Sequence, residues 1–216
     1  MSDDFIPALR FERLTPMFDA VAAVTVRDGA LKRLVLQQAG ISAGDRVLDV
    51  GCGTGTLAAA AARRAPGAAI TGLDADPAIL NQARRRAARE GLELGFDEAM
   101  STALPYPDGS FDLVLSTLFF HHLGDEDKSR TATEIIRVLR PGGRLVVGDL
   151  GRAHDPSMRL AARVTVQVLD GTATTALNVR GGLPGLLTAA GFEEVTVRDR
   201  MRAPIGTLEV ISAVAP

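Results

Sequence analysis

The chain has 216 residues, of which 46% are hydrophobic and 23% are charged, and its formal net charge is −2. This length suits one domain with one sizeable core, and the charge provides no overall positive field for nucleic acid. No apolar run approaches the roughly 20 residues that span a bilayer, and the first ten residues lack the apolar core of a secretory signal. The single cysteine, Cys52, excludes an internal disulfide, so we expect a cytoplasmic protein.

Helical segments alternate with short apolar strands along most of the chain. Residues 5–40 are expected to be helical and to precede the first strand. The expected strands are 46–50, 68–74, 92–98, 111–117 and 144–150, and the helices between them are 57–65, 77–90 and 125–139. The second of these helices begins with Asp76 at the N-cap and Pro77 at the first helical position. Repeated strand–helix–strand units predict an α/β fold with a doubly wound, mostly parallel sheet and helices on both faces.

The last part of the chain departs from this alternation. Helices are expected over residues 158–169 and 183–190, and they are followed by alternating strands over 193–200 and 206–215. The short connection between these two strands predicts an antiparallel pair at one edge. The complete prediction is therefore a seven-stranded sheet in one domain.

A glycine-rich loop, VLDVGCGTG, occupies residues 47–55. Glycine permits positive φ and close approach of a ligand to the backbone, and the helix that follows presents unpaired N–H groups. The loop lies at the carboxyl end of the first strand, where open α/β sheets bind ligands. Asp74, at the end of the second strand and about 20 residues further on, suits hydrogen bonds to both hydroxyls of a ribose. The pattern predicts a nucleoside-bearing cofactor.

The spacing of the glycines discriminates between two kinds of cofactor. Dinucleotide-binding loops have the pattern G-x-G-x-x-G, whereas this chain has Gly51, Gly53 and Gly55, followed by Thr56. Asp49, two residues before the first glycine, suits an ammonium group better than a pyrophosphate. An NAD(P)-dependent oxidoreductase is therefore the less favoured alternative.

Four sequence motifs carry a family resemblance. VLDVGCGTG followed by GLDAD closely resembles the first two motifs of class I S-adenosylmethionine (SAM) dependent methyltransferases. ALPYPDGSFDLVLSTLFFHHL and VLRPGGRLVVGD resemble the later motifs of that family, through its fifth strand. The resemblance is strongest to the small-molecule branch that includes the ubiquinone and menaquinone methyltransferases. It implies a Rossmann-like fold, SAM as cofactor, S-adenosylhomocysteine as product and a small-molecule acceptor.

The resemblance also implies a set of cofactor contacts. The glycines would line the methionine and ribose portions, Asp49 would approach the amino group, and Asp74 would hold the ribose hydroxyls. Where the family often has an acid and a small residue, this chain has Met100 and Ser101, so Met100 is expected to pack against the adenine face. The full set of expected cofactor-binding residues is Asp49, Gly51, Cys52, Gly53, Gly55, Asp74, Ala75, Met100, Ser101 and Ser116.

Methyl transfer from a sulfonium is an in-line displacement that needs no nucleophile on the enzyme. An enclosed site that aligns the acceptor supplies much of the rate, and a general base matters only if the acceptor must lose a proton. His121 and His122 follow the fourth strand and are the candidates, with a weak preference for His121; a packing or capping role is the alternative. His154 is expected in a surface loop. No metal site is expected, because no cluster has metal-ligand spacing.

The segments outside the motifs are expected to form the acceptor side of one methyltransferase domain. We expect an N-terminal helical cap over residues 1–40, a SAM-binding core over 41–150, an acceptor-side insertion over 151–185, and the last helix and antiparallel strands over 186–216. The cap and the insertion carry mostly apolar residues, which suit a lipophilic or aromatic acceptor or simply cover the sheet. These residues are Phe11, Met17, Phe18, Met158, Leu160, Val164, Val168 and Leu169.

Four further expectations concern partners and alternatives. The basic run Arg84–Arg86 with Arg89 is expected to be a solvated helix face rather than a phosphate-binding patch. No nucleic acid partner is expected, since the chain has no basic groove. It also lacks the N/D-P-P-Y type tetrapeptide that resembles the amine-site motif of DNA and protein-glutamine methyltransferases. The oligomeric state stays open, a homodimer included. A non-catalytic SAM-binding or regulatory protein is the second alternative function, because methyl transfer leaves no obligatory catalytic residue to inspect.

Overall fold

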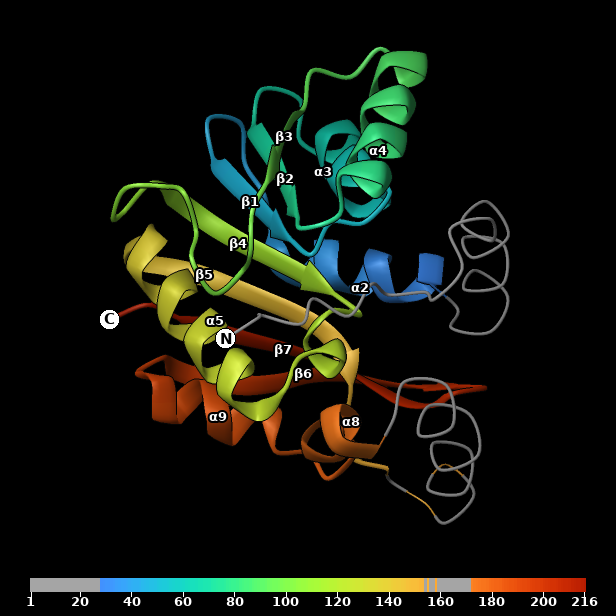
Figure 1. Ribbon diagram of the computed structural model, residues 1–216, viewed down its shortest axis with the longest axis vertical. Helices are drawn as coiled ribbons and strands as arrows, with labels where there is room; N and C mark the ends of the chain where they lie inside the picture. Colours follow the sequence, from blue (N-terminus) through green and yellow to red (C-terminus); the bar gives the residue numbers. More distant parts are fainter. Residues whose placement is uncertain (1–27, 154, 156–157, 159–171) are drawn as a thin grey trace, which may run out of the picture.

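The computed structural model describes residues 28–153, 155, 158 and 172–216 (Figure 1). Several sequence-based expectations lie outside the described residues: helix over 5–27, most of the helix over 158–169, and the position of His154. Among the described residues, no helix is both long and apolar enough to cross a membrane.

A seven-stranded sheet forms the centre of the molecule, with strand order β3-β2-β1-β4-β5-β7-β6. The strands are β1 (Arg46–Val50), β2 (Ala69–Asp74), β3 (Gly95–Glu98), β4 (Phe111–Thr117), β5 (Leu139–Leu150), β6 (Glu193–Ala203) and β7 (Gly206–Val214). Strands β1 to β5 pair in parallel, and β7 pairs antiparallel with both β5 and β6. The predicted α/β fold with an antiparallel C-terminal edge pair is confirmed.

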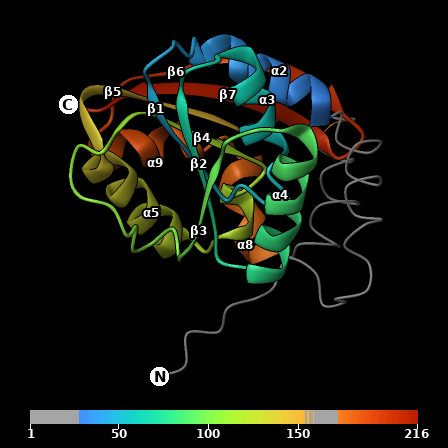
Figure 2. The ribbon, with the colours of Figure 1, turned by 90° about the horizontal axis from the view of Figure 1, so that it is seen from above.

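Helices cover both faces of this sheet (Figure 2). On one face, α2 (Asp28–Ala39) and α3 (Thr56–Arg64) bury an apolar cluster against β1, β4 and β7. On the other face, α5 (Asp125–Val138) and α9 (Leu183–Ala190) bury the larger cluster. Helix α4 (Pro77–Glu90) packs along β2 and β3, and α8 (Thr172–Val179) packs against β5 and the short 3₁₀ helix η1 (Phe120–His122).

Helix α4 shows how closely local sequence determines an element. The Asp76 carboxylate accepts hydrogen bonds from the N–H groups of Ala78 and Ile79, which satisfies two donors of the first turn. Gly91 ends the helix in the left-handed conformation, with φ +62°. Both ends lie where the sequence predicted them.

The fifth strand begins earlier than predicted. The sequence Pro141–Gly142–Gly143 was expected to separate the helix from a strand that starts at residue 144, but β5 begins at Leu139 and includes all three residues. The N–H of Gly142 donates to Ala215 O, and the N–H of Ala215 donates to Gly143 O. This pairing with the end of the chain extends the strand through the two glycines. The local sequence does not predict it, because Ala215 is about 70 residues away from Gly142 and Gly143 along the chain.

The order of the strands fixes where a ligand site can form. The chain runs outward from β1 through β2 and β3, and then returns to place β4 on the other side of β1. The Ser116 hydroxyl on β4 donates to Val50 O on β1 over 2.9 Å, and so ties the carboxyl ends of these two strands together. Open α/β sheets bind ligands at this point of reversal, which is where the glycine loop lies.

Candidate functional site

The glycine loop between β1 and α3 passes over the end of β2. The N–H groups of Gly51 and Cys52 both donate to Leu73 O, over 2.8 and 3.0 Å. Gly51, Gly53 and Gly55 have φ of +69°, +53° and +73°, a left-handed region that costs other residues about 1–2 kcal/mol each. The two hydrogen bonds attach the loop to β2, and the positive φ angles explain why glycine occupies three of its positions.

The three glycines differ in what surrounds them. A Cβ on Gly51 would lie 2.2 Å from Cδ2 of Phe119, and a Cβ on Gly55 would lie 3.0 Å from the Cβ of Ala83. A Cβ on Gly53 would meet no atom of a described residue within 4 Å. Gly51 and Gly55 are thus required for packing, whereas Gly53 faces open space that a ligand can approach.

Asp74 lies directly beside Gly53. Its Oδ2 accepts the Gly53 N–H over 2.9 Å, and its Oδ1 accepts the Asp76 N–H over 3.1 Å. Partial burial raises the pKa of this carboxyl, against the opposing effect of the two N–H donors. Each carboxylate oxygen can accept a further hydrogen bond, so both hydroxyls of a ribose can be bound here.

The segment after β3, which carries Met100, is held against the end of β2 by a backbone contact. The N–H of Ala99 donates to Asp74 O over 3.2 Å. The Met100 side chain is 47% exposed, the only large hydrophobic side chain so exposed in the part of the chain that the structure describes. An exposed thioether on a segment that is bonded to the backbone of residue 74 suits contact with a flat apolar ring.

Beyond β4, the chain turns sharply into η1. Leu118 has φ +53°, a strained conformation for a residue with a branched side chain. The turn brings His121 against Asp149, at the end of β5, with 2.7 Å between Nδ1 and Oδ1. Asp149 also accepts the N–H groups of Phe119 and Leu150, over 3.1 and 2.6 Å. Both side chains of this pair are buried.

Comparison with known proteins settles the family. A methyltransferase domain model matches residues 47–143. A demethylmenaquinone methyltransferase from Thermus thermophilus is 41% identical over 159 residues, which cover 73% of this chain and 71% of that protein. The chain belongs to the class I SAM-dependent methyltransferases.

Other proteins are similar to this chain in sequence or in fold. The chain spans about half, 49%, of a 39% identical uncharacterized protein from Mycobacterium tuberculosis. Among solved structures, the [4+2]-cyclase SpnF has the same fold at 21% identity, with a TM-score of 0.75 and coverage of 94% of this chain and 93% of that one. A SAM-dependent methyltransferase from Methanosarcina mazei has a TM-score of 0.64 at 24% identity, over 79% of this chain and 92% of its own.

The fit of the methyltransferase cofactor is visible at Asp49. This side chain is 1% exposed, and neither carboxylate oxygen has a hydrogen-bond partner in the described structure. Burial raises the pKa of Asp49 to about 7, although the positive charge of Lys32 opposes this shift. A buried carboxylate without a partner is costly, and the amino group of SAM is a cation of the kind that relieves this cost.

Three other predicted cofactor residues use their side chains within the protein. The Ser101 hydroxyl shares a hydrogen bond of 2.8 Å with that of Thr131, and the Ser116 hydroxyl is bound to Val50 O. Cys52 is buried against Gly72, and burial raises the pKa of its thiol. These side chains are held by contacts within the protein, so we expect the backbones of these residues to contact a cofactor, and the whole set of predicted contacts stays a prediction.

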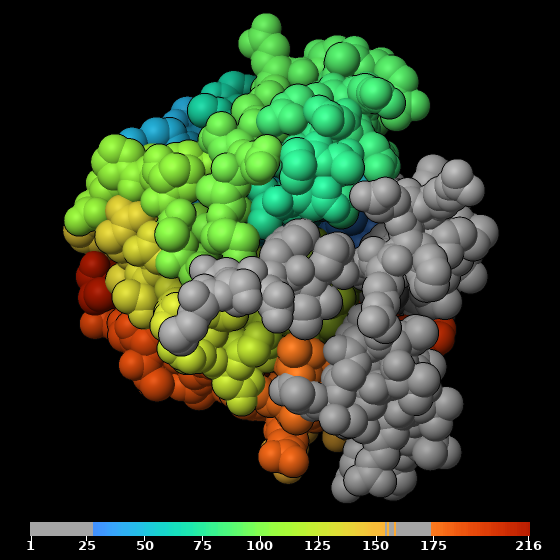
Figure 3. All heavy atoms as spheres, in the orientation of Figure 1, coloured from blue at the N-terminus to red at the C-terminus, as the bar shows by residue number. Residues whose placement is uncertain are grey.

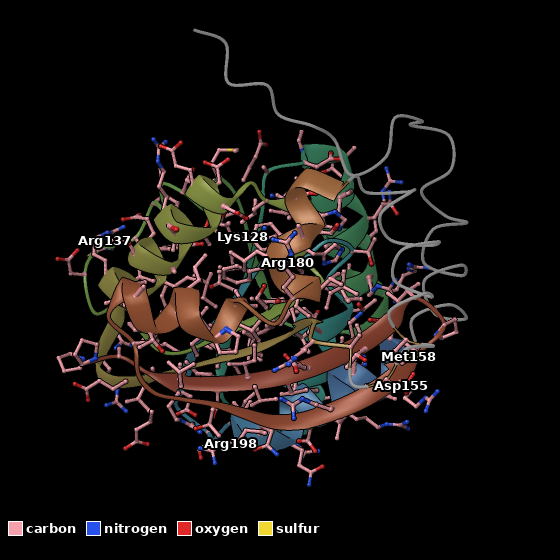
Figure 4. The ribbon with its side chains drawn as sticks, turned by 90° about the horizontal axis from the view of Figure 1, so that it is seen from below. Lys128, Arg137, Asp155, Met158, Arg180 and Arg198 are labelled. Carbon is pink, nitrogen blue, oxygen red and sulfur yellow. The ribbon has the colours of Figure 1, made fainter. Side chains whose placement is uncertain are left out.

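The structure also reveals polar residues that sequence reasoning missed. The Lys128 ammonium is fully buried and donates to the carbonyls of Leu123 and Thr174, each over 2.6 Å, which attaches α8 to η1 (Figure 4). The Asn178 side chain on α8 is also buried, and no partner for its amide lies among the described residues. Asp149 had one usable signal, because it is the only charged residue after Arg144 in the apolar stretch LVVGDL.

No group of three or more His, Cys, Asp or Glu side chains suited to a metal ion occurs among residues whose positions are described.

Proposed function

We propose that this methyltransferase transfers the methyl group of SAM to a small lipophilic or aromatic acceptor, with the cofactor bound across the glycine loop. The observation that carries the proposal is the open space at Gly53 directly beside the Asp74 carboxylate. SAM supplies an electrophilic methyl carbon on a sulfonium sulfur. The residues of the chain are left to bind, align and exclude water.

The cofactor contacts follow the geometry of the loop. Asp74 binds the ribose hydroxyls, and Met100 and Ala75 lie beside the adenine. Asp49 neutralises the amino group and gains the partner that it otherwise lacks. Gly51, Cys52, Gly53 and Gly55 contribute backbone, and Ser101 and Ser116 contribute backbone at the adenine and methionine ends.

His121 serves as general base when the acceptor must lose a proton. A carboxylate only accepts hydrogen bonds, so the proton between His121 and Asp149 is on Nδ1, and Nε2 is the basic atom. The electron pair of the acceptor atom forms the bond to the methyl carbon, the pair of the broken C–S bond stays on sulfur, and the acceptor proton passes to Nε2. His122 is unsuited to this role, because burial and the adjacent His121 lower its pKa to about 3.

The acceptor class is proposed from two sources. The predicted cap over residues 1–40 and the predicted insertion over 151–185 are rich in apolar residues. The relative from Thermus thermophilus is a demethylmenaquinone methyltransferase, a name that indicates a quinone-type acceptor in that protein. An acceptor with an aromatic or quinone-like ring is therefore the first class to test.

A second candidate function has one observation in its favour. A protein with the same fold, SpnF, is described as a [4+2]-cyclase, so this fold does not require methyl transfer. A SAM-binding protein without methyl transfer is accordingly the competing proposal. Incubation with radiolabelled SAM and a panel of naphthols, quinols and catechols separates the two, because only a methyltransferase releases labelled product.

Binding of the product tests the cofactor site directly. Calorimetric titration with S-adenosylhomocysteine is expected to show saturable binding, and titration with NAD none. Gly53→Ala is expected to weaken the former at least tenfold, while Gly91→Ala serves as control: both glycines have positive φ and open space around a Cβ. Equal affinity in the two variants, or binding of NAD alone, contradicts the proposal.

A further inference from the structure

Helix α8 is attached at both of its ends beside the carboxyl end of β5. Near its start, the Lys128 ammonium of α5 donates to Thr174 O over 2.6 Å, and the two helices lie side by side on the face shown in Figure 3. Just past its end, a Cβ on Gly181 would lie 2.8 Å from the Cβ of Arg152, two residues after β5. The helix is therefore held at the edge of the sheet where the cofactor loop also lies.

One side of α8 is turned into the protein between these two attachments. Thr175 and Asn178 are both fully buried, and residues three apart lie on the same side of a helix. The helix packs against η1 and β5, which carry His121 and Asp149. Asn178 therefore lies on the buried side of a helix that covers the two elements of the candidate base.

The side-chain amide of Asn178 takes no part in holding this helix. The main-chain oxygen of Asn178 accepts the Gly181 N–H over 2.8 Å, but neither Nδ2 nor Oδ1 has a hydrogen-bond partner in the described part of the chain. A buried amide without a partner destabilises a folded protein, and a leucine of similar size would avoid this cost. Polar groups that are kept at such a cost are typical of functional sites, so the amide points to a ligand.

The chemistry of the amide indicates which ligand edge it can bind. A carboxamide presents an acceptor oxygen and an NH₂ donor side by side, so the complementary edge has one donor and one acceptor on neighbouring atoms. Two oxygens on adjacent ring carbons, as in a catechol or a hydroxyquinone, provide such an edge, because a hydroxyl both donates and accepts. A ring with one oxygen, or with two oxygens further apart, pairs only half of the amide.

We propose that Asn178 binds the methyl acceptor and selects rings that carry two oxygens on adjacent carbons. Its Oδ1 accepts the proton of one ring hydroxyl, and its Nδ2 donates to the other ring oxygen. The inference rests on the proposed function, because it takes the site beside η1 as the place where the acceptor binds. It narrows the acceptor from lipophilic or aromatic rings in general to those with vicinal oxygens.

Catechol, resorcinol and phenol test this selection. Catechol and resorcinol have the same two hydroxyls and differ only in whether these are on adjacent carbons, and phenol has a single hydroxyl. Dissociation constants are measured by ligand-observed NMR titration, with and without saturating S-adenosylhomocysteine. Catechol is expected to bind the parent at least tenfold more tightly than the other two probes, because it alone pairs both halves of the buried amide.

Two variants and a matched control locate the contact. Asn178→Leu keeps the size of the side chain and Asn178→Ala removes most of it, and both are expected to lose the preference for catechol while they bind S-adenosylhomocysteine as the parent does. Asn81→Leu is the control, since Asn81 is the only other asparagine of the chain and is exposed on α4. The control is expected to keep the preference.

Urea denaturation of the ligand-free proteins separates binding from a structural role. Asn178→Leu is expected to unfold at a higher urea concentration than the parent, because it removes an unpaired buried amide. A lower midpoint would show that the amide is bonded within the protein, and the inference would be wrong.

Three results of the titrations also overturn the inference. They are no binding of catechol, equal binding of catechol and resorcinol, and a preference for catechol that survives in both Asn178 variants. If S-adenosylhomocysteine binds in any of these cases, the proposed cofactor site is unaffected. Catechol binding that depends on Asn178, in a protein that does not bind S-adenosylhomocysteine, contradicts the proposed function alone.

Discussion

The Nδ1 atom of His121 lies 2.7 Å from Oδ1 of Asp149, and this contact joins the turn after β4 to the end of β5. The same carboxylate accepts the Phe119 N–H, and the Phe119 ring packs against Gly51 of the cofactor loop. One buried aspartate thus orients the candidate base and positions the residue that contacts the loop. Its two roles can be separated experimentally.

Asp149→Asn is expected to lower kcat by about 10²–10⁴-fold, the range typical of a lost general base. An amide carbonyl or NH₂ group no longer enforces the proton on Nδ1, and His121 becomes a weaker base without the carboxylate. The pH–rate profile with an acceptor that must lose a proton is expected to move to lower pH on its acidic limb. If Asp149 has only a structural role, the Asp149→Asn variant is less stable but its pH–rate profile has the same acidic limb as that of the parent.

His122→Asn is the matched control for this experiment. The two imidazole rings are 4.0 Å apart between centroids, but His122 has its pKa lowered to about 3 and stays neutral across the assay range. A loss of activity in His122→Asn as large as that in Asp149→Asn or His121→Gln would show that packing, not proton transfer, determines the rate.

Asp49 is expected to make the cofactor-free protein less stable as pH rises. Its pKa is raised from 3.8 to about 7 in the folded state, so the native protein binds more protons than the unfolded chain between these values. The free energy of unfolding therefore falls from about pH 4 to pH 7, by up to about 4 kcal/mol. Asp49→Asn removes the charge at constant size and is expected to flatten this slope.

Urea denaturation at pH 5 and pH 8 checks the slope of both proteins. The variant is also expected to bind S-adenosylhomocysteine more weakly, since it offers no charge to the amino group. Asp149 provides an internal contrast, because its pKa is lowered. Burial raises the pKa of Asp149, but His121 and the Leu150 N–H together lower it by more than burial raises it. Its stabilising effect is present above the unfolded pKa and is lost as pH falls. Parallel pH profiles for Asp49→Asn and the parent would contradict the prediction.

Local patterns in the sequence predicted most of this fold. Strands β1 and β4, helix α4 and its caps, and the glycine loop all follow from hydrophobic runs, capping residues and glycine spacing within a few residues of one another. The candidate cofactor residue Asp74 was predicted from its position at the end of a strand, whereas Met100 was predicted from the family resemblance.

Contacts between distant segments account for what the sequence could not show. Arg86 belongs to a basic run that was expected to be solvated, yet it lines a cleft with Lys32 and Arg63, from two other helices. Asp149 is paired with His121 across 28 residues. The early start of β5 depends on hydrogen bonds to Ala215. None of these pairings leaves a periodic or compositional signal.

Gly51→Ala and Gly53→Ala are expected to differ in stability although both place a side chain at positive φ. Gly53→Ala costs about 1–2 kcal/mol from the backbone alone, because no atom of residues 28–153 or 172–216 lies within 4 Å of the new Cβ. Gly51→Ala adds overlap with Phe119 and is expected to cost about 2–5 kcal/mol in total. Thermal unfolding of both variants measures the difference. Phe119→Ala added to Gly51→Ala tests the cause: a double variant no more stable than the sum of the single changes would show that Phe119 is not the obstacle.

Met100→Asp is expected to strengthen cofactor binding about three- to tenfold. The family often has an acid here that binds the adenine amino group, and a hydrogen bond to a charged group contributes about 1.5–3 kcal/mol before the lost thioether packing is deducted. Met100→Ala is the control, and is expected to weaken binding because it removes the apolar contact alone. Titration with S-adenosylhomocysteine and with S-inosylhomocysteine separates the two effects, because the second ligand lacks the amino group on the purine ring. An equal gain for both ligands would place the new carboxylate elsewhere than at the amino group.

Lys128→Met is expected to loosen α8 without disturbing the cofactor loop. The ammonium is fully buried and is the donor to Leu123 O and Thr174 O, so the variant loses one hydrogen bond at each carbonyl. A hydrogen bond to a charged group contributes about 1.5–3 kcal/mol. Burial lowers the pKa of Lys128, and the nearby Asp125 opposes this shift. Hydrogen exchange is expected to rise in α8 and η1 and to stay unchanged in α3. Uniform acceleration across the sheet would show instead that Lys128 supports the whole fold rather than the attachment of one helix.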